Sequence, residues 1–170
     1  AMDWTQAVDG YCERLGPEFW SEPVNAITNA AFLIAAFVMW RRTFGLGRWL
    51  CALLAAIGIG SFLFHTFAQP WAGVADVTPI VLYVLLYIYA ANRDFWGLSL
   101  WPALGLTLAF FPYAAATVPL FSLIPNIGGT AGYGPVPLLI AIYAFLLRHR
   151  APHTARGLAI GAMILIASLT

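Results

Sequence analysis

Long apolar runs, separated by short polar stretches, make up most of the chain. A helix that crosses the hydrocarbon core of a bilayer needs about 20 mainly apolar residues. The shorter runs reach this length when they borrow flanking residues. The pattern therefore predicts an all-α, polytopic bundle of six transmembrane helices, at 24–40, 49–67, 77–91, 98–118, 134–147 and 157–170. Gly, Pro and Asn gather at 119–137, which indicates a loop.

Composition supports a membrane protein. The 170 residues are 62% hydrophobic and 9% charged, whereas soluble domains carry about a quarter charged residues. We expect one transmembrane domain over residues 1–170, in which residues 1–23 form an acidic extracytoplasmic segment and residues 24–170 carry the helices. The expected partners are membrane lipids, with no nucleic acid.

The basic residues, all arginine, follow an alternating pattern. Seven of the eight fall in every second predicted loop: Arg41, Arg42, Arg48, Arg93, Arg148, Arg150 and Arg156. Basic loops of membrane proteins are cytoplasmic as a rule. The pattern therefore predicts that the N-terminus lies outside.

The last apolar run is short for a membrane helix. Residues 157–170 span about 21 Å as a helix, against a hydrocarbon core of about 30 Å. We expect the natural protein to continue beyond Thr170. Cys12 lies in the polar terminus and Cys51 in an apolar run, so we expect no disulfide between them.

Three polar residues interrupt the apolar pattern where the second predicted helix ends and the third begins. Ser61 and His65 are four residues apart and share one helix face. Pro70 and Gly73 predict a short turn, after which Asp76 takes an N-cap position. We expect Ser61, His65 and Asp76 to converge near the outer membrane boundary.

Two interpretations of this cluster are open. Histidine is the commonest metal ligand, a carboxylate can move a proton and a hydroxyl can steady an oxyanion. The cluster would then belong to a metal-dependent hydrolytic site with Ser61 and Asp76 catalytic and His65 binding the metal. The alternative is a polar cluster that holds helices together. One histidine does not make a zinc site, which needs at least three protein ligands.

His149 and His153 fall in an arginine-rich stretch, and we interpret them as loop residues.

The N-terminal segment carries several carboxylates within 14 residues: Asp9, Glu13, Glu18 and Glu22. Calcium binds six to eight oxygen atoms and accepts backbone carbonyls. A calcium site and a solvated acidic segment are both consistent with this pattern.

These residues together resemble the alkaline ceramidases, in particular their bacterial branch, whose superfamily includes the adiponectin and progestin receptors. The matching pattern is Asp9…Cys12-Glu13…Glu22-Pro23-Val24-Asn25, then Gly60-Ser61-x-x-x-His65, then Asp76-x-x-Pro79. The resemblance runs from about residue 9 to the end of the chain. Its specific motifs are confined to residues 9–29 and 58–80.

The resemblance implies a seven-helix intramembrane hydrolase that cleaves ceramide to a sphingoid base and a fatty acid. It implies Zn2+ held by three histidines, of which His65 matches the first, with Ser61 and Asp76 beside the zinc water. It implies Ca2+ bound by Asp9, Glu13 and Glu22, with a carbonyl from Gly10 or Tyr11. The site would face the periplasm from a bacterial inner membrane.

The chain departs from this family in one respect. The two histidines of the seventh helix are absent, so we expect six helices of a seven-helix fold and no activity from the 170 residues alone. In relatives, the cysteine that matches Cys12 can bond one near the last helix. Two alternatives are a non-enzymatic lipid-binding or receptor-like membrane protein and a hydrolase of another lipid amide or ester.

Overall fold

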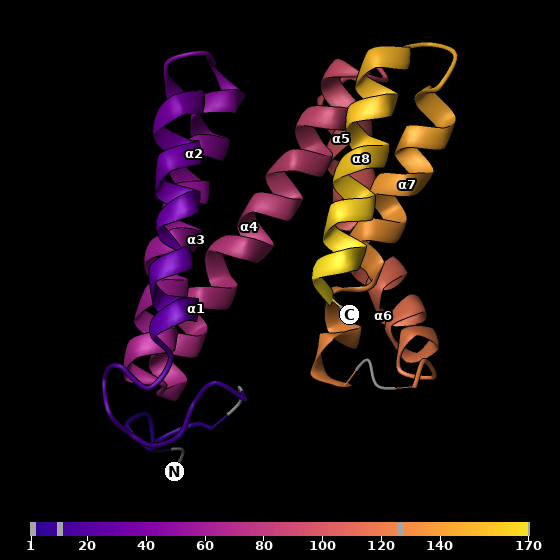
Figure 1. Cartoon of the computed structure of the whole chain (residues 1–170). Coiled ribbons are helices and arrows are strands. Elements are labelled where there is room, and N and C mark those ends of the chain that lie inside the picture. Colours follow the sequence, from indigo (N-terminus) through magenta and orange to yellow (C-terminus); the bar gives the residue numbers. More distant parts are fainter. Residues whose placement is uncertain (1–2, 10–11, 126–127, 170) are drawn as a thin grey trace. The chain divides into compact units, whose positions relative to one another are not determined.

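The computed structural model describes residues 3–9, 12–125 and 128–169, which form helices and connecting segments without a strand among them (Figure 1). The chain divides into two compact units, Ala1–Tyr87 and Ile88–Thr170. The first unit contains α1 (Pro23–Thr28), α2 (Ala30–Trp40), α3 (Leu46–Phe67) and most of α4 (Pro70–Asp94). The second contains the end of α4, α5 (Leu100–Leu108), α6 (Phe110–Phe121), the 3-10 helix η1 (Gly128–Tyr133), α7 (Pro135–Leu147) and α8 (Pro152–Leu169).

Five helical stretches of the described residues are long and apolar enough to cross a membrane: Pro23–Trp40, Leu46–Phe67, Pro70–Asp94, Leu100–Phe121 and Thr130–Leu147. All five carry exposed large apolar side chains, as expected of helices that face lipid. The prediction of an all-α, multi-pass membrane protein is confirmed at this level. Each of the six predicted runs overlaps a helix, although the apolar stretch of α8, Pro152–Ala167, is shorter. The number of crossings and the seven-helix fold stay predictions.

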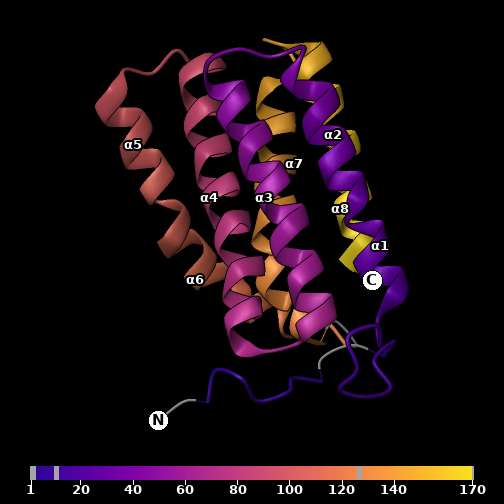
Figure 2. The ribbon, with the colours of Figure 1, turned by 90° about the vertical axis from the view of Figure 1, so that its left-hand side faces the viewer.

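In the first unit, α2 and α3 form an antiparallel pair, and α1 also packs against α3 (Figure 2). Gly45 begins α3 with φ +53°, a left-handed conformation that favours glycine. Asn29 lies between α1 and α2 with helical dihedral angles. Its side chain donates a hydrogen bond to the carbonyl of Asn25 at 2.8 Å, so the two helices form one almost continuous span.

The turn between α3 and α4 differs from the prediction. The chain reverses over Ala68 and Gln69, with Ala68 in the left-handed conformation (φ 46°, ψ 55°). Pro70 is the first residue of α4, a position where its fixed φ suits the helix and its missing N–H is not needed. Gly73 therefore lies inside the helix. Asp76 lies almost two turns into α4, so its predicted N-cap position is wrong.

Gly60 allows α3 and α4 to approach closely. A Cβ atom at this position would overlap the backbone carbonyl of Ala75 and lie 3.1 Å from the Cα of Asp76. Closer to the turn between the two helices, the ring of Phe64 lies against Gly73. A Cβ atom built on Gly73 would lie 3.4 Å from the Cε2 atom of this ring. The next residue after Gly60 is Ser61, so the close approach brings Ser61 beside Asp76.

In the second unit, α7 packs along α8. The Tyr113 hydroxyl of α6 donates to the carbonyl of Pro135 at 2.8 Å, which ties α6 to the start of α7. The Tyr143 hydroxyl of α7 donates to Oδ1 of the buried Asn92 at 2.6 Å. Two polar contacts therefore connect α7 to α6 and to the end of α4.

We predict that Gly60→Ala lowers the free energy of unfolding by about 1–3 kcal/mol, the usual cost of inserting a methyl group into a filled contact. Gly105→Ala is the matched control, because no atom lies within 4 Å of a Cβ built there. It should be neutral or stabilising by up to about 1 kcal/mol, since alanine is the better helix former. Denaturant unfolding in detergent micelles, followed by circular dichroism, measures both. Equal stability of the two variants would contradict the close approach.

Candidate functional site

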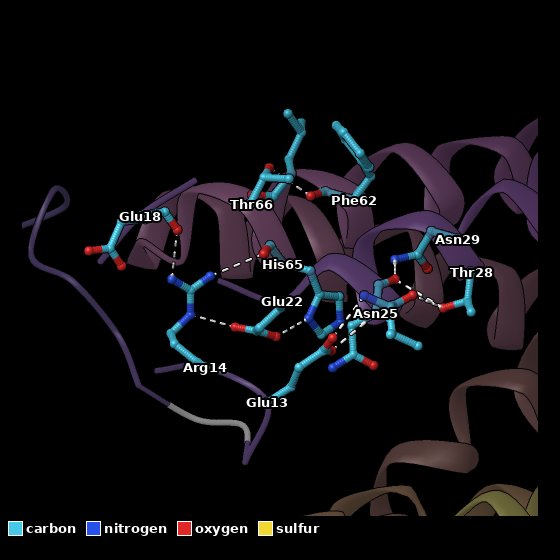
Figure 3. Close-up of polar contacts among 12 residues, drawn as sticks. Glu13, Arg14, Glu18, Glu22, Asn25, Thr28, Asn29, Phe62, His65 and Thr66 are labelled. Atoms are coloured by element: carbon cyan, nitrogen blue, oxygen red, sulfur yellow. Dashed lines mark hydrogen bonds and ion pairs between the residues drawn. The ribbon is translucent and has the colours of Figure 1, made fainter. Parts of the chain in front are cut away.

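Several buried polar residues of the first unit gather where the N-terminal segment meets the end of α3 (Figure 3). His65 lies in the last turn of α3 and is 7% exposed. Glu22 lies just before Pro23 of α1 and is 2% exposed. The two side chains are 43 residues apart in sequence, and His65 Nδ1 lies 2.5 Å from Glu22 Oε2.

Arg14 completes this group from the N-terminal segment. Its Nε donates to Glu22 Oε1 at 2.5 Å, and the arginine is itself only 7% exposed. A buried ion needs a partner of opposite charge, because burial removes its hydration. The guanidinium and the Glu22 carboxylate form such an ion pair, which is neutral as a whole.

The ionised state of Glu22 determines which nitrogen of His65 carries a proton. A carboxylate only accepts hydrogen bonds. Nδ1 must therefore donate its proton to Glu22 Oε2, and in the neutral ring Nε2 keeps the lone pair. A histidine held by a carboxylate in this way presents Nε2 as an acceptor or as a metal ligand.

Arg14 also holds the main chain of His65. Its Nη2 donates to the His65 carbonyl at 3.0 Å, and its Nη1 donates to the Gly16 carbonyl at 3.0 Å. The last four carbonyls of a helix have no partner within the helix, and a cation is favourable at that end. Arg14 thus caps α3 while it neutralises Glu22.

Ser61 and Asp76 lie beside this group. Ser61 is one turn before His65 on α3 and is partly buried, and Asp76 on α4 is 9% exposed. The Asp76 carboxylate interacts with both the Ser61 side chain and His65. The structure therefore brings together the three residues that sequence reasoning grouped, and it adds Glu22 to them.

The three carboxylates predicted to bind calcium have different surroundings. Glu13 accepts hydrogen bonds from the backbone N–H groups of Val24 and Asn25, at 2.8 and 3.1 Å, and so caps α1. Glu22 is paired with Arg14 and His65. Asp9 is exposed. Gly10 and Tyr11, the predicted carbonyl donors, lie outside the described residues.

Within the part of the chain that the structure describes, no three His, Cys, Asp or Glu side chains form a group that could hold a metal ion. His149 and His153 are exposed, the first after α7 and the second in the first turn of α8. Placing His153 in a loop was therefore wrong. Cys12 is exposed and Cys51 is buried, and neither forms a disulfide among the described residues.

Aromatic rings cover the site on the side of the N-terminal segment. Phe19 meets Trp20, Phe62 and Phe67 edge to face, with ring centroids 5.1, 6.4 and 5.2 Å away. Phe67 also contacts Trp71 at the start of α4. These ring contacts attach the N-terminal segment to the ends of α3 and α4.

Sequence reasoning missed Arg14 and the role of Glu22. One signal was available, because Arg14 is the arginine that does not fall in the alternating loops. A lone cation in an acidic segment indicates a specific partner. Which of the nearby carboxylates it pairs with depends on how the segment folds back onto α3.

A comparison of the chain with protein-family models, with curated protein sequences and with solved structures finds no match in any of the three.

We predict that Arg14→Met lowers the free energy of unfolding by about 3 kcal/mol, because it leaves the ionised Glu22 buried without its cation. Glu18→Gln is the matched control. Glu18 is an exposed carboxylate of the same segment, where a substitution changes stability by about 0.5 kcal/mol or less. Denaturant unfolding in micelles measures both. A loss in Arg14→Met no larger than in Glu18→Gln would mean that the pair does not stabilise the fold.

Proposed function

We propose that the chain is an intramembrane hydrolase of lipid amides, related to the alkaline ceramidases, which cleaves ceramide to a sphingoid base and a fatty acid. The observation that supports this is the grouping of Ser61, His65 and Asp76 at one end of two apolar helices, with His65 held by a buried carboxylate. Ionisable side chains at membrane depth are rare and usually functional.

Each side chain can be given a chemical task. Asp76 takes a proton from the attacking water and returns it to the leaving nitrogen as the C–N bond breaks. The Ser61 hydroxyl donates a hydrogen bond to the oxygen that becomes negative when water adds to the carbonyl carbon. The apolar faces of α3 and α4 beside this group suit the two hydrocarbon tails of ceramide.

The donor set does not fit a complete zinc site. The resemblance implies Zn2+ on three histidines, whereas His65 supplies one imidazole and the described residues contain no metal-binding group of three. A zinc site needs at least three protein ligands. The steps above are therefore assigned to Asp76 and Ser61 alone, and His65 as a zinc ligand stays a proposal.

The proposed Ca2+ site fits two of its three carboxylates better than the third. Glu22 is hydrogen-bonded by Arg14 and His65, and a cation placed beside it would meet the charge of Arg14. Asp9 is exposed and Glu13 is partly exposed, so both could take part. The N-terminal segment and the site would face the outside, the periplasm of a bacterium, as the arginine pattern predicts.

A non-enzymatic, receptor-like membrane protein is the second candidate. The observation that favours it is that Arg14, Glu22 and His65 also work as a structural connection between the N-terminal segment and α3. In that case Asp76 and Ser61 would be a polar contact between helices. Hydrolysis of ceramide by the wild-type protein separates the two functions.

We predict that Asp76→Asn lowers the rate of ceramide hydrolysis by the full-length protein at least about 100-fold, the usual contribution of a general acid–base group. Asp94→Asn is the matched control, because Asp94 is an exposed aspartate at the other end of the same helix. Release of fatty acid from a labelled ceramide measures the rate, and mass spectrometry gives the metal content of each protein, which we expect to be unchanged.

If Asp76→Asn hydrolysed ceramide at the wild-type rate, Asp76 would have no part in the mechanism. No turnover by the wild-type protein, with ceramide or another lipid amide and with Zn2+ and Ca2+ supplied, would favour the receptor-like function.

A further inference from the structure

We propose that Glu22 and Arg14 are positioning residues that set the tautomer and the orientation of His65. Glu22 would fix the proton on Nδ1, and Arg14 would pair with Glu22 and keep it turned toward the ring. The tautomer follows from the contacts alone. Its importance for catalysis rests on the proposed function, in which His65 lies beside Ser61 and Asp76.

The first support is that Arg14 holds His65 at two points, directly at the carbonyl and through Glu22 at the ring. Arg14 donates to the His65 carbonyl through Nη2 and to Glu22 through Nε. Glu22 in turn contacts the ring at Nδ1. The backbone and the ring are thereby positioned against the same guanidinium, so neither can rotate without breaking a buried hydrogen bond.

The second support is that the arrangement allows only one set of donors and acceptors. Arg14 has donors and no acceptor, and ionised Glu22 has acceptors and no donor. In both hydrogen bonds Glu22 is therefore the acceptor: Arg14 Nε donates to Oε1, and His65 Nδ1 donates to Oε2. All three side chains are buried, so water does not provide an easy alternative partner.

The chemistry of the Glu22→Gln variant makes this proposal testable. A glutamine amide has one oxygen that accepts and one NH2 group that donates. Arg14 Nε can only donate, so it would draw the amide oxygen, and the NH2 group would turn toward His65. The ring must then accept at Nδ1, which moves its proton to Nε2. A substitution of nearly equal size should thus reverse the tautomer.

Nitrogen-15 NMR of the histidine side chains tests this in the full-length protein. The chain has three histidines, and a His65→Gln variant identifies the signals of His65. Measured where the ring is neutral, the wild-type protein should show a protonated Nδ1 and an unprotonated Nε2. In Glu22→Gln the two signals should exchange character.

Glu13→Gln is the matched control. It alters another carboxylate of the same segment, which contacts the start of α1 and not the ring. It should leave the His65 tautomer as in the wild type, even if it loosens the segment. A structural effect of the segment would move both variants alike, whereas a positioning effect moves only Glu22→Gln.

Two results would overturn the proposal: a wild-type His65 protonated at Nε2, or a Glu22→Gln protein that keeps its proton on Nδ1. The wild-type spectrum decides the first point even if Glu22→Gln does not fold. If the wild-type protein hydrolyses ceramide, Glu22→Gln should lower the rate by about 10–100-fold. The spectrum does not depend on turnover, so a failed proposed function and a failed positioning role give different results.

Discussion

The buried ion pair between Arg14 and Glu22 determines how the first unit is closed at the end of α3. Each charge is stable there only because the other is present, and the two lie eight residues apart in the N-terminal segment. The pair therefore fixes the segment itself. From this one contact follow the cap on the last turn of α3 and the hydrogen bond to the His65 ring.

The close packing of α3 on α4 at Gly60 supplies the second constraint. It acts on the other side of the site, because it places Ser61 beside Asp76. The ion pair positions His65, and the contact between α3 and α4 positions Ser61 and Asp76. The cluster thus combines a polar constraint from the surface segment with a steric constraint inside the membrane-spanning part.

Sequence reasoning located the membrane helices because a bilayer demands long apolar runs, and these are visible in one dimension. It grouped Ser61, His65 and Asp76 correctly because helical spacing and chain proximity suffice for that. It placed the start of α4 too late, since Pro70 and Gly73 were interpreted as a turn. Ala68, which makes the turn in a left-handed conformation, has no sequence signature. The pairing of Arg14 and Glu22 with His65 was missed because such partners are chosen by the folded chain.

The separation in sequence of these partners has a consequence for biosynthesis. Arg14 leaves the ribosome 51 residues before His65, which corresponds to about 3–10 s at ordinary rates of translation. During this interval Arg14 and Glu22 have been synthesised, but the end of α3 that they contact has not. The site is consequently completed late, after α3 has been inserted, and the N-terminal segment must stay accessible until then.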